Sequence, residues 1–492
     1  MLSLMPVKDR INVFKNEYLH LPLQAKASIW FLFCLVLQKG ISAISTPIFT
    51  RLMTPYEYGQ YGVFNSWLGI VSIIVSLSLT SGIHMQGLVK FDKERNFFSS
   101  SLQSLLTILV LAWTGIYLLF QNFWNNIFSL SSLQILSMLI MIWATSIFNF
   151  WANEQKVDYK YRALVILTLL VSLADPLFGI YLVTTSKDKV TARILGVMVV
   201  ELIGYSWLYF KQIKYSKVVF SKRFWSYALC LGLPLLPHYL SQVMLNNSDR
   251  IMIKSMVGAT ETGIYDLAYS VSLIMIIFNI ALLQTISPWL YQRIKNKCTQ
   301  DIAPIAYMTL IFIAIVNLFL MIFAPEIISV FAPQAYYEAI WVVPPVSMSV
   351  FFMYCYDLFA KFAFYYEKIK FIVIASIIAA VSNIALNYIF IDLYGYIAAG
   401  YTTLFCFIIY AIGHYIFMKR VCDQFCNSEY PYETNKLLII SCIFLVAGFT
   451  VLSTYNYPLI RYGIIVAIGI ILMYFRILIV DKIKMLIKVR IR

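Results

Sequence analysis

The sequence predicts an all-α polytopic membrane protein with about fourteen transmembrane helices. Apolar residues make up 61% of the 492 residues and charged residues only 12%, against roughly 45–50% and about 25% in an ordinary soluble domain. At about 20 residues per bilayer crossing, the apolar residues suffice for about fourteen spans. Little of the chain is left over, which excludes a large domain outside the membrane.

The expected spans are runs of apolar residues found with a window of about 19 positions. No apolar stretch with a small-residue cleavage site precedes residue 27, so we expect the first run to be an insertion signal and not a cleaved signal peptide. In chain order, the expected spans are 27–50, 61–82, 101–120, 132–152, 163–184, 191–210, 225–247, 264–287, 302–324, 339–360, 370–391, 395–418, 436–454 and 458–479.

Lysine and arginine are distributed unevenly between alternate loops. If the N-terminus is cytoplasmic, 30 of the 38 Lys and Arg residues lie on the cytoplasmic side, seven lie on the other side and Lys39 lies inside the first span. This asymmetry follows the positive-inside rule and predicts that both termini are cytoplasmic. We expect the basic C-terminal tail to be a stop-transfer flank, with binding of anionic membrane lipids as the alternative.

Several other classes of protein are excluded. The net charge of +15 comes from short basic stretches between apolar runs and not from one patch, which excludes a nucleic-acid partner. The eight Cys and four His residues lack the spacing of a disulfide framework or a zinc site. Phosphate-binding glycine loops, HExxH and nucleophile elbows are absent from the sequence. The sequence therefore predicts no catalytic residue, no metal and no cofactor.

The chain carries a weak internal repeat. Glu57-Tyr-Gly59-Gln-Tyr61 follows the first expected span, and Glu261-Thr-Gly263-Ile-Tyr265 follows the seventh, 204 residues later. Chance similarity between apolar segments is the alternative, but polar positions on one helix face also match. At an offset of 208 the aligned pairs are Thr168 with Ser376, Asp175 with Asn383, and Gly179 with Asn387.

Six spans per repeat is an even number, so both copies would share one orientation and be related by an axis along the membrane normal. The sequence therefore predicts two six-helix lobes in a parallel pseudo-twofold repeat. The expected domains are an N-lobe at 1–210, a C-lobe at 211–420, and a segment at 421–492 that holds the last two spans and the basic tail.

Lys39 is the deepest basic residue. A charged side chain at mid-span costs about 2.5–3.5 kcal/mol, so it indicates a bundle interior or an aqueous cavity. Lys39 shares one helix face with Thr46 and other hydroxyl residues, which favours a cationic group facing a cavity. The alternative is an internal ion pair that serves packing, with Asp175 or Asp357 as the partner.

A second polar stripe lies on the seventh expected span. It contains His238, Gln242, Asn246 and Asp249, preceded by prolines that free backbone carbonyls. His238 could instead be a satisfied core histidine, and Asp249 with Arg250 could be interface anchors. Other ionisable residues inside spans are Asp175, Glu201, Asp357 and His414. Because desolvation favours the protonated form of a carboxyl group, the acids among them are candidates for proton coupling.

Two segments resemble a known family. Arg51-Leu-Met-Thr-Pro-Tyr-Glu-Tyr-Gly59 resembles the signature of the bacterial polysaccharide biosynthesis flippases, the O-antigen transporter group. Gly232-Leu-Pro-Leu-Leu-Pro-His238, followed by Asp249-Arg250 and the Gly263 segment, is similar to the second signature of these Wzx-like proteins. Their superfamily also contains the multidrug-and-toxin extruders and the lipid II flippase.

The resemblance implies a flippase of the bacterial inner membrane. It would move an undecaprenyl-diphosphate-linked oligosaccharide, an O-antigen or capsule repeat unit, to the periplasmic leaflet by alternating access through a cationic cavity. A polysaccharide polymerase and a chain-length regulator would be its possible partners, beside membrane lipids. The candidate substrate-binding residues are Lys39, Thr46, Arg51, His238, Gln242, Asn246 and Arg250. The candidate ion-coupling residues are Asp175, Asp249 and Asp357.

Two other functions stay open. A cation-coupled multidrug exporter of the same superfamily would need acidic cavity residues, which Asp175, Glu201 and Asp357 could supply. A membrane polysaccharide polymerase or glycosyltransferase usually needs a sizeable outer loop, whereas every expected outer loop here is short. We therefore expect a transporter and not an enzyme.

Overall fold

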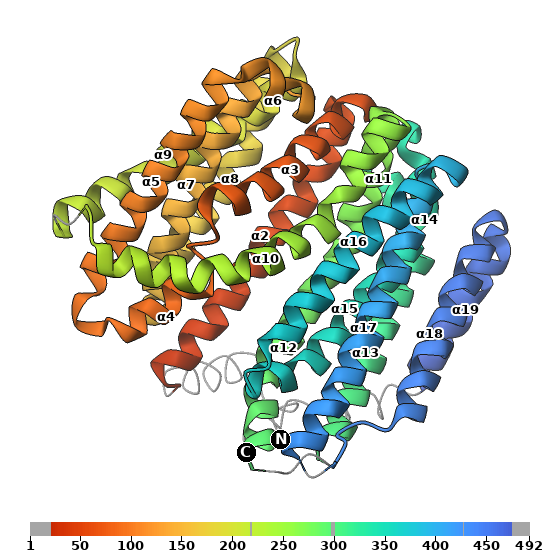
Figure 1. Ribbon diagram of the computed structural model, residues 1–492. Helices are drawn as coiled ribbons and strands as arrows, with labels where there is room; N and C mark the ends of the chain where they lie inside the picture. Colours follow the sequence, from red (N-terminus) through yellow and green to blue (C-terminus); the bar gives the residue numbers. More distant parts are fainter. Residues whose placement is uncertain (1–20, 217–218, 297–300, 427, 475–492) are drawn as a thin grey trace, which may run out of the picture. The chain divides into compact units, whose positions relative to one another are not determined.

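The computed structural model describes residues 21–216, 219–296, 301–426 and 428–474 of the chain (Figure 1). Every regular element in these ranges is a helix, so the expected all-α class is confirmed. The basic N-terminal arm at 1–20 and the basic tail at 475–492 lie outside the described residues.

Most helices are long and joined by short turns. In chain order the α-helices are α2 (Leu23–Leu52), α3 (Pro55–Ser76), α4 (Gly82–Lys90), α5 (Arg95–Leu119), α6 (Gln121–Phe128), α7 (Ser132–Val157), α8 (Tyr161–Thr185), α9 (Lys189–Ser216), α10 (Lys222–Met256), α11 (Ala259–Ser272), α12 (Ile276–Lys295), α13 (Ile302–Ile322), α14 (Ala324–Phe331), α15 (Val343–Tyr365), α16 (Ile369–Tyr394), α17 (Ala398–Phe425), α18 (Thr434–Ser453) and α19 (Pro458–Tyr474). The 3₁₀ segments are η2 (Asp92–Glu94), η3 (Leu273–Met275), η5 (Gln334–Trp341) and η6 (Thr454–Asn456).

Each expected span coincides with a helix. Among the described residues, 12 helical segments are long and apolar enough to cross a membrane. The other two expected spans fall on α3, whose first half carries Gln60 and Asn65, and on α19, which is described for 17 residues. The count of fourteen therefore stays a prediction.

Several helical segments are longer than the expected spans, and two exceed them by at least 12 residues. α10 has 35 residues, about 52 Å at 1.5 Å per residue, whereas the hydrocarbon core is about 30 Å thick. The expectation of 225–247 was too short because the helix continues through the polar residues at both of its ends. The segment Ala259–Lys295 has 37 residues, in which η3 joins α11 to α12.

The described chain forms two compact units. The first contains residues up to Ser45 and the segment Val71–Leu236, and the second contains Thr46–Ile70 and everything from Pro237 onward. Three helices belong partly to each unit. Helices α2 and α10 begin in the first unit and end in the second, whereas α3 begins in the second and ends in the first. The second unit thus includes a hairpin, residues 46–70, from the N-terminal part of the chain. The lobe boundaries expected from the repeat stay a prediction.

In the first unit, α7, α8 and α9 pack against one another, and α5 packs on α7 and α9. Helices α8 and α9 approach closely at a pair of glycines: a Cβ atom on Gly196 would lie 2.8 Å from the Cα atom of Gly179. His84 on α4 is fully buried, and its Nε2 atom lies 3.0 Å from Ser99 Oγ on α5.

In the second unit, the mostly buried helix α15 is central. It packs against α11, α12, α13 and α17, while α16 packs on α17 and α18 packs on α13. Aromatic side chains fill the contacts, as where the Phe351 and Phe444 rings lie 4.4 Å apart. These helices carry the polar faces described below.

The two glycines of the sequence repeat contact each other. A Cβ atom on Gly59 of α3 would lie 1.9 Å from the carbonyl oxygen of Ala259, and one on Gly263 of α11 would lie 2.0 Å from the carbonyl oxygen of Pro55. Because Gly59 and Pro55 each stand 204 positions before Gly263 and Ala259, the contact is reciprocal. Such a contact is what a twofold relation between equivalent surfaces produces, and it supports the repeat.

Candidate functional site

Three helices of the second unit bring polar faces to one interior. On α10 the face carries His238, Gln242 and Asp249, and on α17 it carries Thr403, Tyr410 and His414. Residues separated by four, seven or eleven positions lie on one side of an α-helix. On α16 the same spacing places Ser376, Asn383 and Asn387 together. Hydrogen bonds join the three faces at successive levels.

The Asp249 carboxylate is the best satisfied acid of this interior. It is fully buried and accepts hydrogen bonds from Tyr265 Oη at 2.6 Å, Asn387 Nδ2 at 2.7 Å and Thr403 Oγ1 at 2.9 Å. All three donors are uncharged. Burying a carboxylate costs free energy, and hydrogen bonds of this kind offset part of that cost.

Further oxygen atoms surround this carboxylate. Asn383 Oδ1 accepts from Ser248 Oγ at 3.3 Å and from Asn387 Nδ2 at 3.2 Å, and Asn387 Oδ1 accepts from Thr402 Oγ1. We call these residues, with Asp249, Tyr265 and Thr403, the Asp249 network. Carboxylate, amide and hydroxyl oxygens are the ligands of hard cations. No group of three or more His, Cys, Asp or Glu side chains that could hold a metal ion occurs in the described ranges.

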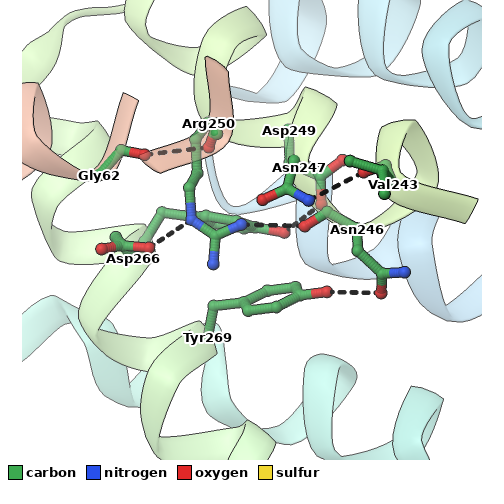
Figure 2. A network of polar contacts seen from close by, with 10 residues as sticks. Gly62, Val243, Asn246, Asn247, Asp249, Arg250, Asp266 and Tyr269 are labelled. Carbon is green, nitrogen blue, oxygen red and sulfur yellow. Dashed lines mark hydrogen bonds and ion pairs between the residues drawn. The ribbon is translucent and has the colours of Figure 1, made fainter. Parts of the chain in front are cut away.

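Arg250, the next residue, has separate partners (Figure 2). Its Nε atom donates to Asp266 Oδ1, and its Nη1 atom donates to the carbonyl oxygen of Asn246 at 2.9 Å. The guanidinium group lies 4.2 Å from the centre of the Tyr269 ring. Both charged side chains are buried, with 8% and 12% of their surface exposed. Gly62 on α3 leaves room for Asp266, because a Cβ atom there would lie 2.9 Å from Asp266 Oδ2.

Two further hydrogen bonds lie beyond the Asp249 network, closer to the start of α16 and to the end of α17 than the network is. Gln242 Nε2 donates to Tyr410 Oη at 3.0 Å, and His238 Nδ1 lies 2.9 Å from Ser376 Oγ. The structure therefore brings Asp249, Gln242 and His238 into one polar interior, as the sequence stripe suggested. Their roles in binding or coupling stay predictions.

The basic candidates on α2 lie in different surroundings. Lys39 is exposed and belongs to the first unit, where no described ion pair joins it to Asp175. Thr46 and Arg51 belong to the second unit. Arg51 Nη2 donates to the carbonyl oxygen of Val330 at 2.9 Å, so it caps the last turn of α14. Thr50 Oγ1 adds a hydrogen bond to the carbonyl oxygen of Phe331 at 2.6 Å.

Acidic residues of the first unit form a smaller polar site. Asp175 Oδ1 is buried without a hydrogen-bond partner, and Arg193 Nη1 donates to the backbone oxygen of Asp175 at 3.2 Å. Glu201 Oε2 accepts from Thr145 Oγ1 at 3.1 Å. Asp357 belongs to the second unit, on α15, one helical turn before a lysine.

Tyr265, Thr403 and Asn387 were not among the site residues expected from the sequence. Asn387 was part of a recognised stripe, and the spacing of Thr403, Tyr410 and His414 on one helix could have shown a third polar face. Tyr265 ends the recognised repeat segment that begins at Glu261, but its hydrogen bond to Asp249 joins two different helices and only the tertiary structure shows it.

Comparison with known proteins identifies the family. Residues 25–294, more than half of the chain, match the sequence profile of the family described as polysaccharide biosynthesis protein. The chain belongs to this family. Residues 234–389 also match the MatE family. The resemblance inferred from the segments at Arg51 and Gly232 is thereby confirmed.

Relatives in this group match most of the length of the chain. A Haemophilus influenzae protein named for the Lsg locus is 23% identical over 389 residues, which cover 74% of this chain and 91% of that protein. The lipid II flippase MurJ, in an inward closed conformation, has a TM-score of 0.70 at 16% identity and covers 92% of this chain and 100% of its own. An inward-facing multidrug resistance transporter of the MATE family has a TM-score of 0.60 at 13% identity. The match covers 78% of this chain and 95% of that transporter.

The likeness to the two solved structures concerns the fold, since both identities are low. With the family match and the 12 apolar helices, it establishes a multi-pass membrane protein of the flippase type within the transporter superfamily of MurJ and the MATE proteins. The substrate and the coupling ion are separate questions.

Proposed function

We propose that this chain moves an undecaprenyl-diphosphate-linked oligosaccharide across the bacterial inner membrane, toward the outer leaflet. The observation that carries this proposal is the match of residues 25–294 to the polysaccharide biosynthesis family in an all-helical membrane protein. Surface polysaccharide repeat units are built on a lipid carrier, so this family needs a step that carries the sugars across the membrane. Both termini would be cytoplasmic, as the distribution of Lys and Arg favours.

The Asp249 network is proposed as the site that couples transport to a cation. In the structure, three neutral donors satisfy the Asp249 carboxylate. A bound cation or proton would neutralise the carboxylate, and the side chains of Asn387 and Thr403 would then turn their oxygen atoms inward. The two states differ in contacts between α10, α16 and α17. A ligand shifts a conformational equilibrium only through such a difference in contacts.

The test of coupling is Asp249→Asn. Asparagine keeps the size and one acceptor oxygen but cannot bind a cation through charge, so we expect transport to fall at least about tenfold with normal protein abundance. The measurement is the appearance of lipid-linked repeat units on the outside of vesicles that contain purified protein. Asp392→Asn, at an exposed position on α16, is the matched control and should transport normally. Unchanged, gradient-dependent transport by Asp249→Asn would remove this network from the mechanism.

Lys39 is proposed as a contact for the diphosphate, because its exposed ammonium group lies on an apolar membrane helix and phosphate oxygens form charge-assisted hydrogen bonds. Lys39→Ala should leave the protein inserted but abolish surface polysaccharide, with lipid-linked units accumulating in the inner leaflet. Lys39→Arg should retain part of the display. Lys222→Ala, at the exposed start of α10, should have no effect. Normal display by Lys39→Ala at equal abundance would exclude this contact.

The remaining substrate candidates are proposed from their positions in the second unit. His238, Gln242 and Asn246 face the polar interior of the second unit, while Thr46, Arg51 and Arg250 already have protein partners or lie beside them. A polysaccharide polymerase and a chain-length regulator are the proposed partners, since both act on the translocated repeat unit.

A cation-coupled multidrug exporter is the second candidate. The match of residues 234–389 to the MatE family favours it, as do the half-buried acids Asp175 and Glu201 of the first unit. Efflux of cationic dyes from cells that express the chain distinguishes the two functions. The proposed flippase should restore polysaccharide to a flippase-deficient strain and leave dye retention unchanged.

A further inference from the structure

A groove runs between α16 and α17 of the second unit. It has a volume of about 460 Å³ and is lined mainly by apolar side chains. Ile374 and Ile378 of α16 and Phe405 and Ile409 of α17 line it, and each is about half exposed. Both helices are apolar enough to cross a membrane, and an aqueous cavity there would need polar or charged lining. The occupant of this groove should therefore be hydrocarbon and not water.

Small residues open the groove. Ala375 and Ala379 of α16 line it together with Gly413 of α17. A Cβ atom on Gly413 would have no neighbouring atom of the described chain within 4 Å. This glycine is thus not required by a close helix crossing, in contrast to Gly59 and Gly263. The space beside Gly413 is open to a ligand.

The groove extends far along α16. Its lining runs from Phe371 to Leu386, about 22 Å at 1.5 Å per residue. The hydrocarbon core of a bilayer is about 30 Å thick, so one leaflet supplies about 15 Å. The acyl chain of an ordinary phospholipid occupies one leaflet and would leave part of the groove unfilled. A longer chain that passes the middle of the bilayer would fill it.

One end of the groove is basic. Lys370 directly precedes Phe371, and Arg420 lies seven positions after Gly413, on the same face of α17. The rings of Phe371 and Phe417 stack 3.8 Å apart, which brings the start of α16 to the end of α17. The charged residues at 367–370 and 419–423 are Glu367, Lys368, Lys370, Lys419, Arg420 and Asp423. Four of these six are basic, so an anionic head group suits this end.

We infer that the groove is the docking site for the isoprenoid tail of the lipid-linked substrate, with Lys370 and Arg420 receiving its diphosphate. A chain that moves from the bilayer into the groove gains no hydrophobic free energy, because lipid tails are equally apolar. Selection must come from the length of the chain and from the charge of its head. Ammonium and guanidinium groups form charge-assisted hydrogen bonds with phosphate oxygens. A long isoprenoid chain with a diphosphate head meets both conditions.

The position of the groove fits the loading of substrate. The distribution of Lys and Arg places the basic end on the cytoplasmic side, where the proposed transport begins. The Tyr410 ring also lines the groove, while its hydroxyl group accepts from Gln242 Nε2 of α10 at 3.0 Å. A docked tail therefore touches a side chain that is bonded to the polar interior. The inference rests on the proposed function and names the place where the lipid part of the substrate binds.

The first test is photo-crosslinking of the full chain in nanodiscs, with radiolabelled undecaprenyl diphosphate as the probe. Benzoylphenylalanine replaces Phe405 in the groove or, as the matched control, Phe449 on α18; these side chains are 51% and 43% exposed. We expect crosslinking at 405 to exceed that at 449 at least about fivefold, a difference of about 1 kcal/mol in binding free energy. Lys370→Gln with Arg420→Gln should lower the crosslinking at 405 at least about threefold.

Two results of this experiment would overturn the docking site. One is equal crosslinking at 405 and 449. The other is competition at 405 by excess phosphatidylglycerol that is as strong as competition by unlabelled undecaprenyl diphosphate, because the groove would then hold ordinary membrane lipid.

The second test fills the groove. Gly413→Leu should reach normal abundance and lower both crosslinking at 405 and transport at least about fivefold, since the added side chain occupies the space of the tail. Ser382→Leu fills the groove from α16 and should act alike. Gly115→Leu on α5, where a Cβ atom also has nothing within 4 Å, is the control. Normal transport by either filled variant would overturn the role of the groove.

The proposed function is tested separately by the unmodified chain in a flippase-deficient strain. If the chain restores surface polysaccharide but crosslinking shows no preference for position 405, the docking site is wrong and the proposed function stands.

Discussion

Alanine at Gly59 should strongly reduce the amount of folded protein. The new Cβ atom would lie 1.9 Å from the carbonyl oxygen of Ala259 and 2.7 Å from the backbone nitrogen of Gly263. Backbone atoms cannot turn aside as a flexible side chain can, so α3 and α11 would have to separate. Overpacking of this kind costs about 1–3 kcal/mol and sometimes more, and we expect a loss in the free energy of unfolding of about 3 kcal/mol.

The same reasoning predicts an equal effect of Gly263→Ala, whose Cβ atom would lie 2.0 Å from the carbonyl oxygen of Pro55. Gly82→Ala and Gly115→Ala are matched controls, because nothing lies within 4 Å of a Cβ atom at either position. Thermal unfolding in detergent, with protein abundance in membranes, measures all four variants. Normal stability of Gly59→Ala and Gly263→Ala would show that α3 and α11 do not cross at these glycines.

Removing the Arg250 charge should have the largest effect of any single substitution on α10. Arg250→Ala leaves the buried Asp266 carboxylate without its partner, and breaking a buried pair from one side costs about 3–5 kcal/mol. The substitution also removes the contact between the guanidinium group and the Tyr269 ring. We therefore expect little folded Arg250→Ala protein. Arg293→Ala is the control: its pair with Asp301 is 39% and 59% exposed, and such pairs contribute about 0–1 kcal/mol.

A double substitution separates the structural role of Arg250 from a role in substrate binding. Arg250→Met with Asp266→Leu replaces both charges by apolar groups of similar size, which is often neutral for stability. We expect the double variant to recover most of the abundance that Arg250→Ala loses. If transport recovers as well, Arg250 serves packing only. If abundance recovers and transport does not, a charged residue at this position is needed for transport. Failure of the double variant to regain abundance would contradict the isolated-charge explanation.

Much of the architecture followed from the sequence because membrane helices are specified locally. About 20 apolar residues in a row bury all of their backbone groups in one helix, so each expected span coincides with a helix. The repeat at Gly59 and Gly263 was equally visible, since glycine is required where two backbones touch and matched polar positions inside a membrane are rare. Membership of the polysaccharide biosynthesis family followed from the segments at Arg51 and Gly232.

Only the tertiary structure decided which polar residues are hydrogen-bond or ion-pair partners. From the sequence, Asp249 was a candidate for ion coupling and Arg250 a candidate for substrate binding. Packing gives Asp249 neutral donors from α11, α16 and α17 and gives Arg250 the carboxylate of Asp266. Likewise, Arg51 looked like a cationic cavity residue, and its contact with the end of α14 depends on a segment 279 residues away. Helix periodicity shows which face of a helix is polar. It cannot show which helix that face meets, because that choice depends on long-range packing.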